Sequence, residues 1–151
     1  MLASGSSQRK RGTRPAGTAR VVGPRPPQYN GGMDAKTAAW IKGYRQAWET
    51  NDPDQIGALF TDDAEYRPEP WTDPWRGRDS IVQQWLARKD EPGAATFEWH
   101  EVAVTDDVSV VEGTTAYRDG RTYSNMWVIR LNREGRATHF TEWWMDHSVP
   151  S

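Results

Sequence analysis

The chain has 151 residues, of which 36% are hydrophobic and nine are tryptophan, enough for one domain with a buried core. The absence of cysteine excludes disulfides and thiolate metal sites, and no apolar run approaches the roughly 20 residues of a membrane span, so we expect no membrane partner and a cytoplasmic location. Residues 1–32 carry six basic and no acidic residues, which leaves residues 33–151 with 13 bases against 21 acids and argues against a nucleic-acid partner for the folded part.

Residues 1–32 are rich in Gly, Pro, Ser and Arg. This composition buries too little apolar surface to offset the entropy of ordering the chain, so we expect a disordered basic tail. It can be read as an arm for anionic partners, as a transit peptide, or as a non-native extension upstream of a start at Met33. Its prolines would interrupt an amphipathic helix, so we favour the extension and place the domain at residues 33–151.

Two helices are expected at the beginning of this domain. Asp34 is typical of an N-cap, and apolar residues recur at helical spacing over residues 35–50. Asp52 as a second N-cap, with Pro53 at the first helical position, favours a short second helix. We expect that helix to be closed by Thr61–Asp63.

A short strand is expected over residues 64–67, followed by the segment RPEPWTDPWRGRD, which contains Trp71 and Trp75. Its three prolines exclude a helix or a central strand, so the segment is predicted to be a loop. Residues 77–80 begin a third helix, which ends at the Glu-Pro-Gly sequence of residues 91–93.

From about residue 95 the hydrophobic period changes to two. This pattern predicts four strands, over residues 95–105, 108–118, 121–132 and 136–147. The segments between them are rich in Asp, Asn and Gly and are typical of hairpin turns. Helices followed by an antiparallel meander indicate an α+β fold, with three N-terminal helices packed on one face of a curved sheet.

The last predicted strand is apolar on both faces. Alternation places Phe140, Glu142 and Trp144 on one face, and Trp143 and Met145 on the other. One face must meet the helices. The other is too apolar to be left in water, so we expect a homodimer through the outer sheet face.

The order of elements and several motifs resemble the nuclear-transport-factor-two-like superfamily, in particular its SnoaL-like branch. The matching motifs are AWETND at residues 47–52, IxxLFTDDA at 56–64, GRDSI at 77–81 and NxxGR at 132–136. The resemblance spans about residues 33–148. It implies a cystatin-like cone, in which a bent sheet wraps around the helices and leaves one pocket open at an end, often in a homodimer.

In this family the segment between the first short strand and the third helix borders the pocket mouth. The resemblance therefore implies that Trp71 and Trp75 form a rim or lid over a concave apolar site. Alternatively, both indoles plug the end of the barrel. We favour the lid, because a loop rarely needs two indoles for packing alone.

The resemblance allows the chemistry of several relatives to be compared with this chain. Ketosteroid isomerases use a first-helix tyrosine, which Tyr44 matches. Their carboxylate base falls on Pro68, beside Glu69, and their protonated acid falls on Trp127, so steroid isomerisation is not favoured. Limonene epoxide hydrolases use a last-strand acid, matched by Glu142, together with an Arg-x-Asp pair that this chain lacks.

Polyketide cyclases use a single acid–base residue in an apolar pocket, and Glu142 fits this role best. Burial among aromatic rings would raise its pKa. The alternative is that Glu142 is a structural acid bonded to a Trp N–H or to Asn125.

His100 is a candidate acid–base partner, although strand parity does not say whether its face lines the pocket. The alternative is that His100 is an ordinary sheet histidine. Tyr44 or Asn125 would polarise a substrate oxygen.

The residues expected to contact the ligand are Tyr66, Glu69, Trp71, Trp75, Asn125, Trp127, Phe140 and Trp144. The sequence indicates no metal site and no cofactor, because the histidines lack ligand spacing and the domain has no phosphate-binding glycine loop. We expect a small-molecule ligand, apolar and ring-containing, and acid–base cyclisation, dehydration or isomerisation through Glu142. A non-catalytic ligand-binding or dimerisation module of the same fold is the alternative, favoured by the missing second acid.

Overall fold

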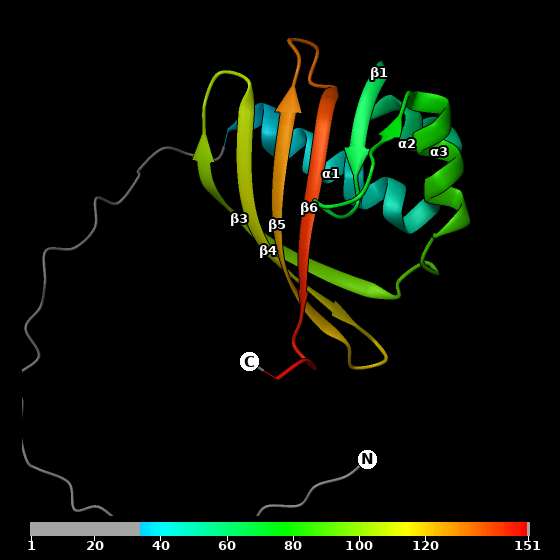
Figure 1. The fold of residues 1–151 in the computed structure, drawn as a ribbon, viewed down its shortest axis with the longest axis vertical. Helices are drawn as coiled ribbons and strands as arrows, with labels where there is room; N and C mark the ends of the chain where they lie inside the picture. Colours follow the sequence, from blue (N-terminus) through cyan, green and yellow to red (C-terminus); the bar gives the residue numbers. More distant parts are fainter. Residues whose placement is uncertain (1–33, 151) are drawn as a thin grey trace, which may run out of the picture. The chain divides into compact units, whose positions relative to one another are not determined.

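The computed structural model describes residues 34–150, so the expectations for residues 1–32 lie outside the described part of the chain. Three helices and six strands follow one another (Figure 1), one strand more than expected, because Trp75–Arg76 form a short strand in the segment predicted to be a loop. They are α1 (Ala35–Thr50), α2 (Pro53–Ala58), β1 (Phe60–Arg67), β2 (Trp75–Arg76), α3 (Arg78–Ala87), β3 (Ala95–Val104), β4 (Val108–Tyr117), β5 (Thr122–Leu131) and β6 (Ala137–Asp146). The fold class is confirmed.

The first two helices begin where the capping residues predicted. The Asp34 carboxylate accepts hydrogen bonds from the backbone N–H and the hydroxyl of Thr37, at 3.0 and 2.9 Å. The Asp52 carboxylate accepts from the first two free backbone N–H groups of α2, which begins with Pro53. Helix α1 ends at Thr50, and the next residue, Asn51, has a φ of 51°, the left-handed conformation that stops a helix.

Strand β1 begins earlier than predicted. Thr61–Asp63 do not close α2 but lie inside β1, because the helix already ends at Ala58. Phe60 is fully buried and pairs with Ala137, and a register shift follows before pairing resumes at Glu65. The buried aromatic ring therefore places Phe60 in the sheet, whereas the expected closure of the helix at residues 61–63 would have placed it in α2.

The six strands form one curved sheet in the order β2-β1-β6-β5-β4-β3. Strands β3 to β6 are the predicted antiparallel meander. Strand β1, by contrast, pairs with β6 in parallel, at the opposite end of the domain sequence. Figure 1 shows the three helices gathered on one side of the strands, with α1 running behind them.

An aromatic core fills the space between the helices and the sheet. Trp40 of α1 packs edge-on against Phe60 and Phe140, with ring centroids 6.1 and 5.0 Å apart. The Trp40 indole N–H donates to the carbonyl of Leu59 at 2.9 Å, so even this buried ring has its polar atom satisfied. These contacts fix α1 against β1 and β6, the two strands that hold part of the site.

The opposite face of the sheet is partly apolar, as the alternation predicted. Its exposed hydrophobic residues include Met126, Trp143 and Met145. Met126 and Trp143 are direct neighbours in the β5–β6 register. Among residues 34–150 no helix has both the length and the apolar character needed to cross a membrane.

Candidate functional site

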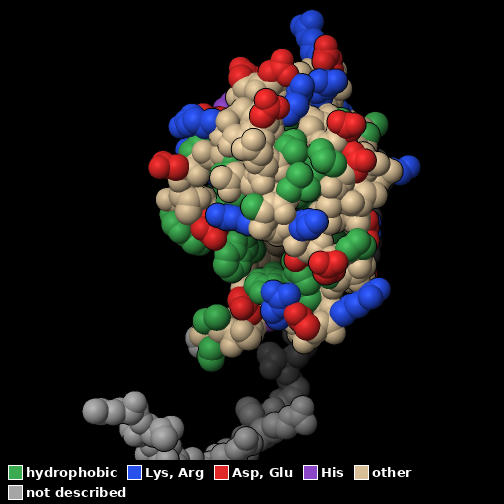
Figure 2. All heavy atoms as spheres, turned by 90° about the vertical axis from the view of Figure 1, so that its right-hand side faces the viewer, with side chains coloured by type: hydrophobic (Ala, Val, Ile, Leu, Met, Phe, Trp, Pro, Cys, Tyr) green, Lys and Arg blue, Asp and Glu red, His purple; other side chains and the backbone are tan. Residues whose placement is uncertain are grey.

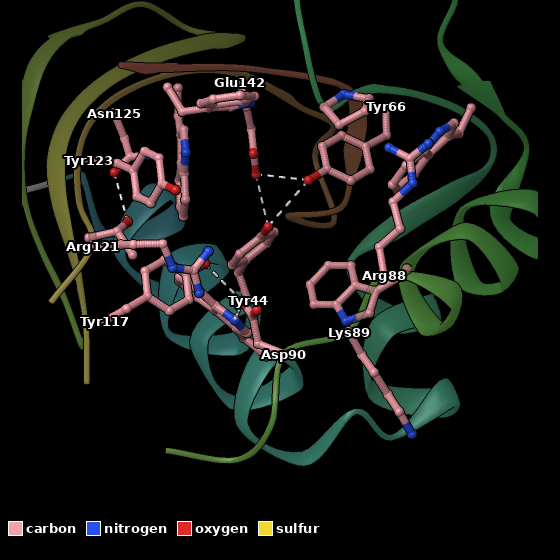
Figure 3. A pocket seen from close by; sticks show the side chains of 17 residues that line it. Tyr44, Tyr66, Arg88, Lys89, Asp90, Tyr117, Arg121, Tyr123, Asn125 and Glu142 are labelled. Atoms are coloured by element: carbon pink, nitrogen blue, oxygen red, sulfur yellow. Dashed lines mark hydrogen bonds between the residues drawn. The ribbon is translucent and has the colours of Figure 1, made fainter. Parts of the chain in front are cut away.

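A cavity of about 300 Å³ lies between α1, the end of α3 and strands β1, β4, β5 and β6 (Figure 3). Aromatic side chains form most of its wall: Tyr44, Trp48, Tyr66, Trp75, Trp85, Tyr117, Tyr123, Trp127 and Trp144. The other lining residues are Pro68, Arg88, Lys89, Asp90, Thr115, Arg121, Asn125 and Glu142. The wall is thus apolar, with a few convergent polar groups, as is typical of small-molecule sites.

Glu142 is the central polar group of this cavity. It lies opposite Trp127 in the β5–β6 register and two residues after the buried Phe140, on the same face of β6, so the pleat directs it inward. Its Oε1 atom accepts hydrogen bonds from the hydroxyls of Tyr44 and Tyr66, at 2.9 and 2.8 Å. The two hydroxyl oxygens are 3.3 Å apart, and Figure 3 shows the three groups converging.

Burial raises the pKa of Glu142 to about 7, although the hydrogen bonds from Tyr66 and Tyr44 act in the opposite direction. Desolvation outweighs the two donors because aromatic rings surround the carboxyl group. Burial, followed by the neighbouring Glu142 charge, also raises the pKa of Tyr44 and of Tyr66. Near neutral pH, Glu142 therefore exchanges a proton readily, while both tyrosines stay protonated as donors.

Strand β5 contributes Asn125 and Trp127 to the wall of the cavity. The Thr115 hydroxyl donates to the side-chain oxygen of Asn125 at 2.7 Å. This bond fixes the orientation of the Asn125 amide and does not occupy its NH₂ group, which remains a donor. The Trp127 indole N–H is buried and has no acceptor among the described residues. Its ring is held by stacking on Phe97, with centroids 4.4 Å apart. Asn125 thus places a donor group on the strand next to Glu142, whereas the Trp127 N–H is enclosed in the wall.

A second carboxylate, Asp90, lines the same cavity and was not predicted from the sequence. Its Oδ2 atom accepts from the Trp48 indole N–H and the Tyr117 hydroxyl, both at 2.9 Å. Burial and the hydrogen bond to Asp90 raise the pKa of Tyr117 well above its usual range. The three residues come from α1, the segment after α3, and β4, so no local sequence pattern reveals the contact.

The structure brings most of the predicted site residues together. Those that line the cavity are Tyr44, Tyr66, Trp75, Asn125, Trp127, Glu142 and Trp144. Phe140 is fully buried behind them, stacked on Tyr66 with centroids 4.8 Å apart. It supports the wall rather than lining it.

Three further predicted residues do not line the cavity. His100 is exposed, pairs with Glu112 in the β3–β4 register, and places its Nε2 atom 3.5 Å from the Glu112 carboxylate on the outer face of the sheet. Trp71 is 74% exposed, so of the two loop indoles only Trp75 borders the cavity. Glu69 is also outside the lining; its neighbour Pro68 takes that place.

No three His, Asp or Glu side chains among residues 34–150 are placed to hold a metal ion. The charged face seen in Figure 2 mixes acidic and basic side chains, and hydrophobic side chains gather around a hollow in it. The chemistry that the described residues offer is therefore proton transfer and hydrogen bonding in an aromatic cavity.

Residues 41–140 match the SnoaL-like domain family. Among solved structures, an NTF-2-like protein of unknown function from Burkholderia xenovorans is 18% identical with a TM-score of 0.60, the alignment covering 77% of this chain and 88% of that one. The epoxide hydrolase/cyclase-like enzyme SalBIII, described in pyran ring formation in the polyether salinomycin, is 18% identical with a TM-score of 0.58, over 73% of this chain and 91% of that one.

A steroid delta-isomerase from Pseudomonas aeruginosa is 20% identical with a TM-score of 0.55, over 76% of this chain and 83% of that one. A search of curated proteins found no match. At these sequence identities the likeness to solved structures shows the fold alone. The match to the SnoaL-like domain family covers well over half of the chain.

Proposed function

Because this chain belongs to the SnoaL-like domain family, we propose that its cavity binds an apolar, ring-containing small molecule and that Glu142 carries a proton during its conversion. The reaction class is acid–base catalysis without a cofactor: cyclisation, dehydration or isomerisation. The cyclase-like enzyme and the isomerase among the structural neighbours support this class by analogy of fold.

The observation that carries the proposal is a carboxyl group with a pKa of about 7 inside an aromatic cavity. A general acid or base works best when its pKa lies near the operating pH. An exposed glutamate would be almost fully ionised at neutral pH and would be a poor acid. Burial at this site gives Glu142 both protonation states in comparable amounts.

The geometry supports one sequence of proton movements. In its ionised form, Glu142 takes a proton from a substrate carbon next to a carbonyl group, and the electron pair moves onto the carbonyl oxygen. The Asn125 NH₂ group stabilises that oxygen by hydrogen bonding. Glu142 then returns the proton to another atom of the substrate, so the step is balanced and needs no further reactant. Tyr44 and Tyr66 hold the carboxyl group in position.

A non-catalytic binding module of the same fold is the second candidate. Both tyrosine hydroxyls donate to a single oxygen of Glu142, which is also what a purely structural acid would show. A structural neighbour described as a computationally designed 17-OHP binder has this fold with a TM-score of 0.52. In this alternative the cavity retains a ligand without changing it.

One screen separates the two candidates. Aromatic and terpenoid metabolites are titrated against the intrinsic fluorescence of the cavity tryptophans, and each bound compound is analysed by mass spectrometry and NMR for a changed product. Glu142→Gln should bind the substrate but lose at least about 100-fold in turnover, the size of a typical general acid–base contribution. The exposed Glu112→Gln is the matched control and should retain activity. Undiminished turnover by Glu142→Gln would exclude Glu142 as the proton carrier.

We also propose that a second copy of this chain covers the outer sheet face. Met126, Trp143 and Met145 form a contiguous apolar area across β5 and β6, with 37–52% of each residue exposed. An exposed area of this kind is typical of an interface. A symmetric dimer would remove it from water while leaving the cavity, on the opposite face, accessible.

A further inference from the structure

Basic side chains border the mouth of the cavity. Arg88 and Lys89 follow directly after α3, and Arg121 lies in the turn between β4 and β5. In Figure 3, Arg88 lies beside Tyr66 on one side of the cavity and Arg121 beside Tyr117 on the other, while the Lys89 side chain extends away. Two guanidinium groups from distant parts of the chain therefore flank the opening.

The two arginines are oriented by aromatic and acidic neighbours. The Arg121 Nε donates to Asp119 at 2.8 Å, and its guanidinium carbon lies 4.4 Å from the centre of the Tyr117 ring. Its two terminal NH₂ groups make no ion pair among the described residues. The Arg88 guanidinium lies 5.2 Å from the centre of the Trp75 ring and has no carboxylate within 4 Å in the described part of the chain.

Of the acids near the mouth, Asp119 pairs with Arg121, and none pairs with Arg88. Asp90 is engaged by Trp48 and Tyr117, and Asp119 by Arg121 alone. Residues 33–151 as a whole hold eight more acids than bases, so the unpaired Arg88 and the terminal NH₂ groups of Arg121 run against the general charge of the domain. Guanidinium groups placed on aromatic rings are well suited to bind carboxylates, because their N–H groups form a fixed planar fork.

We propose that the ligand is an apolar ring compound that carries a carboxylate, which Arg88 and Arg121 hold at the mouth while the ring lies against the indoles. This inference rests on the proposed function and names the substrate class for the same cavity: a cyclic or aromatic carboxylic acid. The carboxylate fixes which end of the ligand enters first. The uncharged end therefore reaches Glu142, and no second negative charge is brought next to its carboxyl group.

The test uses two probes that differ only in charge, 2-naphthoate and 2-naphthamide, titrated by calorimetry at low ionic strength. The naphthoate should bind about fivefold more tightly or better, a preference in the range of a charge-assisted hydrogen bond, and added salt should reduce it. The double variant Arg88→Gln/Arg121→Gln should lose this preference and keep its affinity for the amide. The double variant Arg45→Gln/Arg133→Gln has the same net charge and changes exposed arginines outside the cavity, so it should keep the preference.

Any other result of this experiment contradicts a specific part of the proposal. Equal affinity of the two probes for the unmodified protein contradicts the carboxylate subsite but leaves an apolar ligand pocket. A preference that survives in Arg88→Gln/Arg121→Gln, or that disappears equally in the control variant, contradicts the assignment to these two residues. If neither probe binds, the proposed ligand pocket fails, and the subsite fails with it.

Discussion

Two tyrosine hydroxyls and one carboxylate oxygen meet at the wall of the cavity, and their balance sets the protonation of Glu142. Each tyrosine bond stabilises the ionised carboxylate and so lowers its pKa, while burial raises it to about 7. Removing either hydroxyl should therefore raise the pKa of Glu142 further. The protonation of Glu142 depends on both burial and the tyrosine hydrogen bonds, because burial alone would keep its carboxyl group protonated over a wider pH range.

This balance can be measured by ¹³C NMR on protein labelled at the glutamate carboxyl. The Glu142 resonance should titrate near pH 7, and Tyr44→Phe and Tyr66→Phe should each shift its midpoint upward by about half a unit to one unit, the worth of one hydrogen bond. Tyr123→Phe removes a hydroxyl from the same cavity that does not bond to Glu142, and should leave the midpoint unchanged. A midpoint near 4.5 in the unmodified protein would contradict burial of the carboxyl group.

The raised pKa also predicts how stability depends on pH. Glu142 is protonated in both folded and unfolded chains well below pH 4.5, so it has no pH-linked effect there. As the pH rises from about 4.5 to 7 the unfolded chain loses the proton first, which destabilises the folded state by up to about 3 kcal/mol. Glu142→Gln should therefore be more stable than the unmodified protein at about pH 8 and nearly equal at about pH 4 in urea unfolding. If Glu142→Gln were instead less stable than the unmodified protein at about pH 8, the predicted direction of the effect would be wrong.

The sequence predicted some of the side chains of the site and missed others. Tyr44 and Glu142 were found through the family resemblance, and strand alternation then placed Glu142 on the same face as Phe140. Strand parity alone left the face of His100 open, because parity does not say which face of β3 meets the helices. The contact of Asp90 with Tyr117 joins segments 27 residues apart through side chains alone, and no local pattern encodes it.

At the scale of elements, β4 is shaped by one glycine. A Cβ atom at Gly113 would lie 2.4 Å from Phe97 Cε2 and 2.9 Å from the Glu98 carbonyl oxygen. Phe97 in turn stacks on Trp127, which lines the cavity. The close approach of β3 and β4 at this point therefore sets the position of the β5 wall.

Gly113→Ala should destabilise the protein by about 1–3 kcal/mol, because Phe97 must move and the packing around it is dense. Urea unfolding measures this, and probe binding should weaken as Trp127 shifts. The neighbouring Thr114→Ala, on the exposed face, is the control and should change stability by less than about 0.5 kcal/mol. Equal effects of the two substitutions would contradict the steric role of this position.

The elements themselves were largely predictable. Caps, hairpin turns and the change of period located two helices and four strands to within a few residues, since these signals are local. The parallel pairing of β1 with β6 was not predicted, because it joins segments more than 70 residues apart and leaves no mark on either one. The order of elements in the resembling family supplied the bent sheet, which local patterns do not.

At the scale of the whole molecule, the outer sheet face makes the state of association testable. The unmodified protein should sediment as a dimer at micromolar concentration. Trp143→Glu combined with Met145→Glu should sediment as a monomer, because two charges would be buried at the interface. Trp71→Glu changes an exposed indole in the loop before β2 and should leave the dimer intact. A monomer in the unmodified protein at that concentration would contradict the proposal.

The position of β6 between β1 and β5 has a consequence for synthesis of the chain on the ribosome. The last strand to emerge supplies Glu142, whose tyrosine partners precede it by 98 and 76 positions. Until that strand leaves the exit tunnel, β1 and β5 each present an unpaired edge, which invites association with other nascent chains. A frameshift or nonsense codon shortly before Ala137 should therefore yield insoluble material rather than a soluble protein of reduced activity.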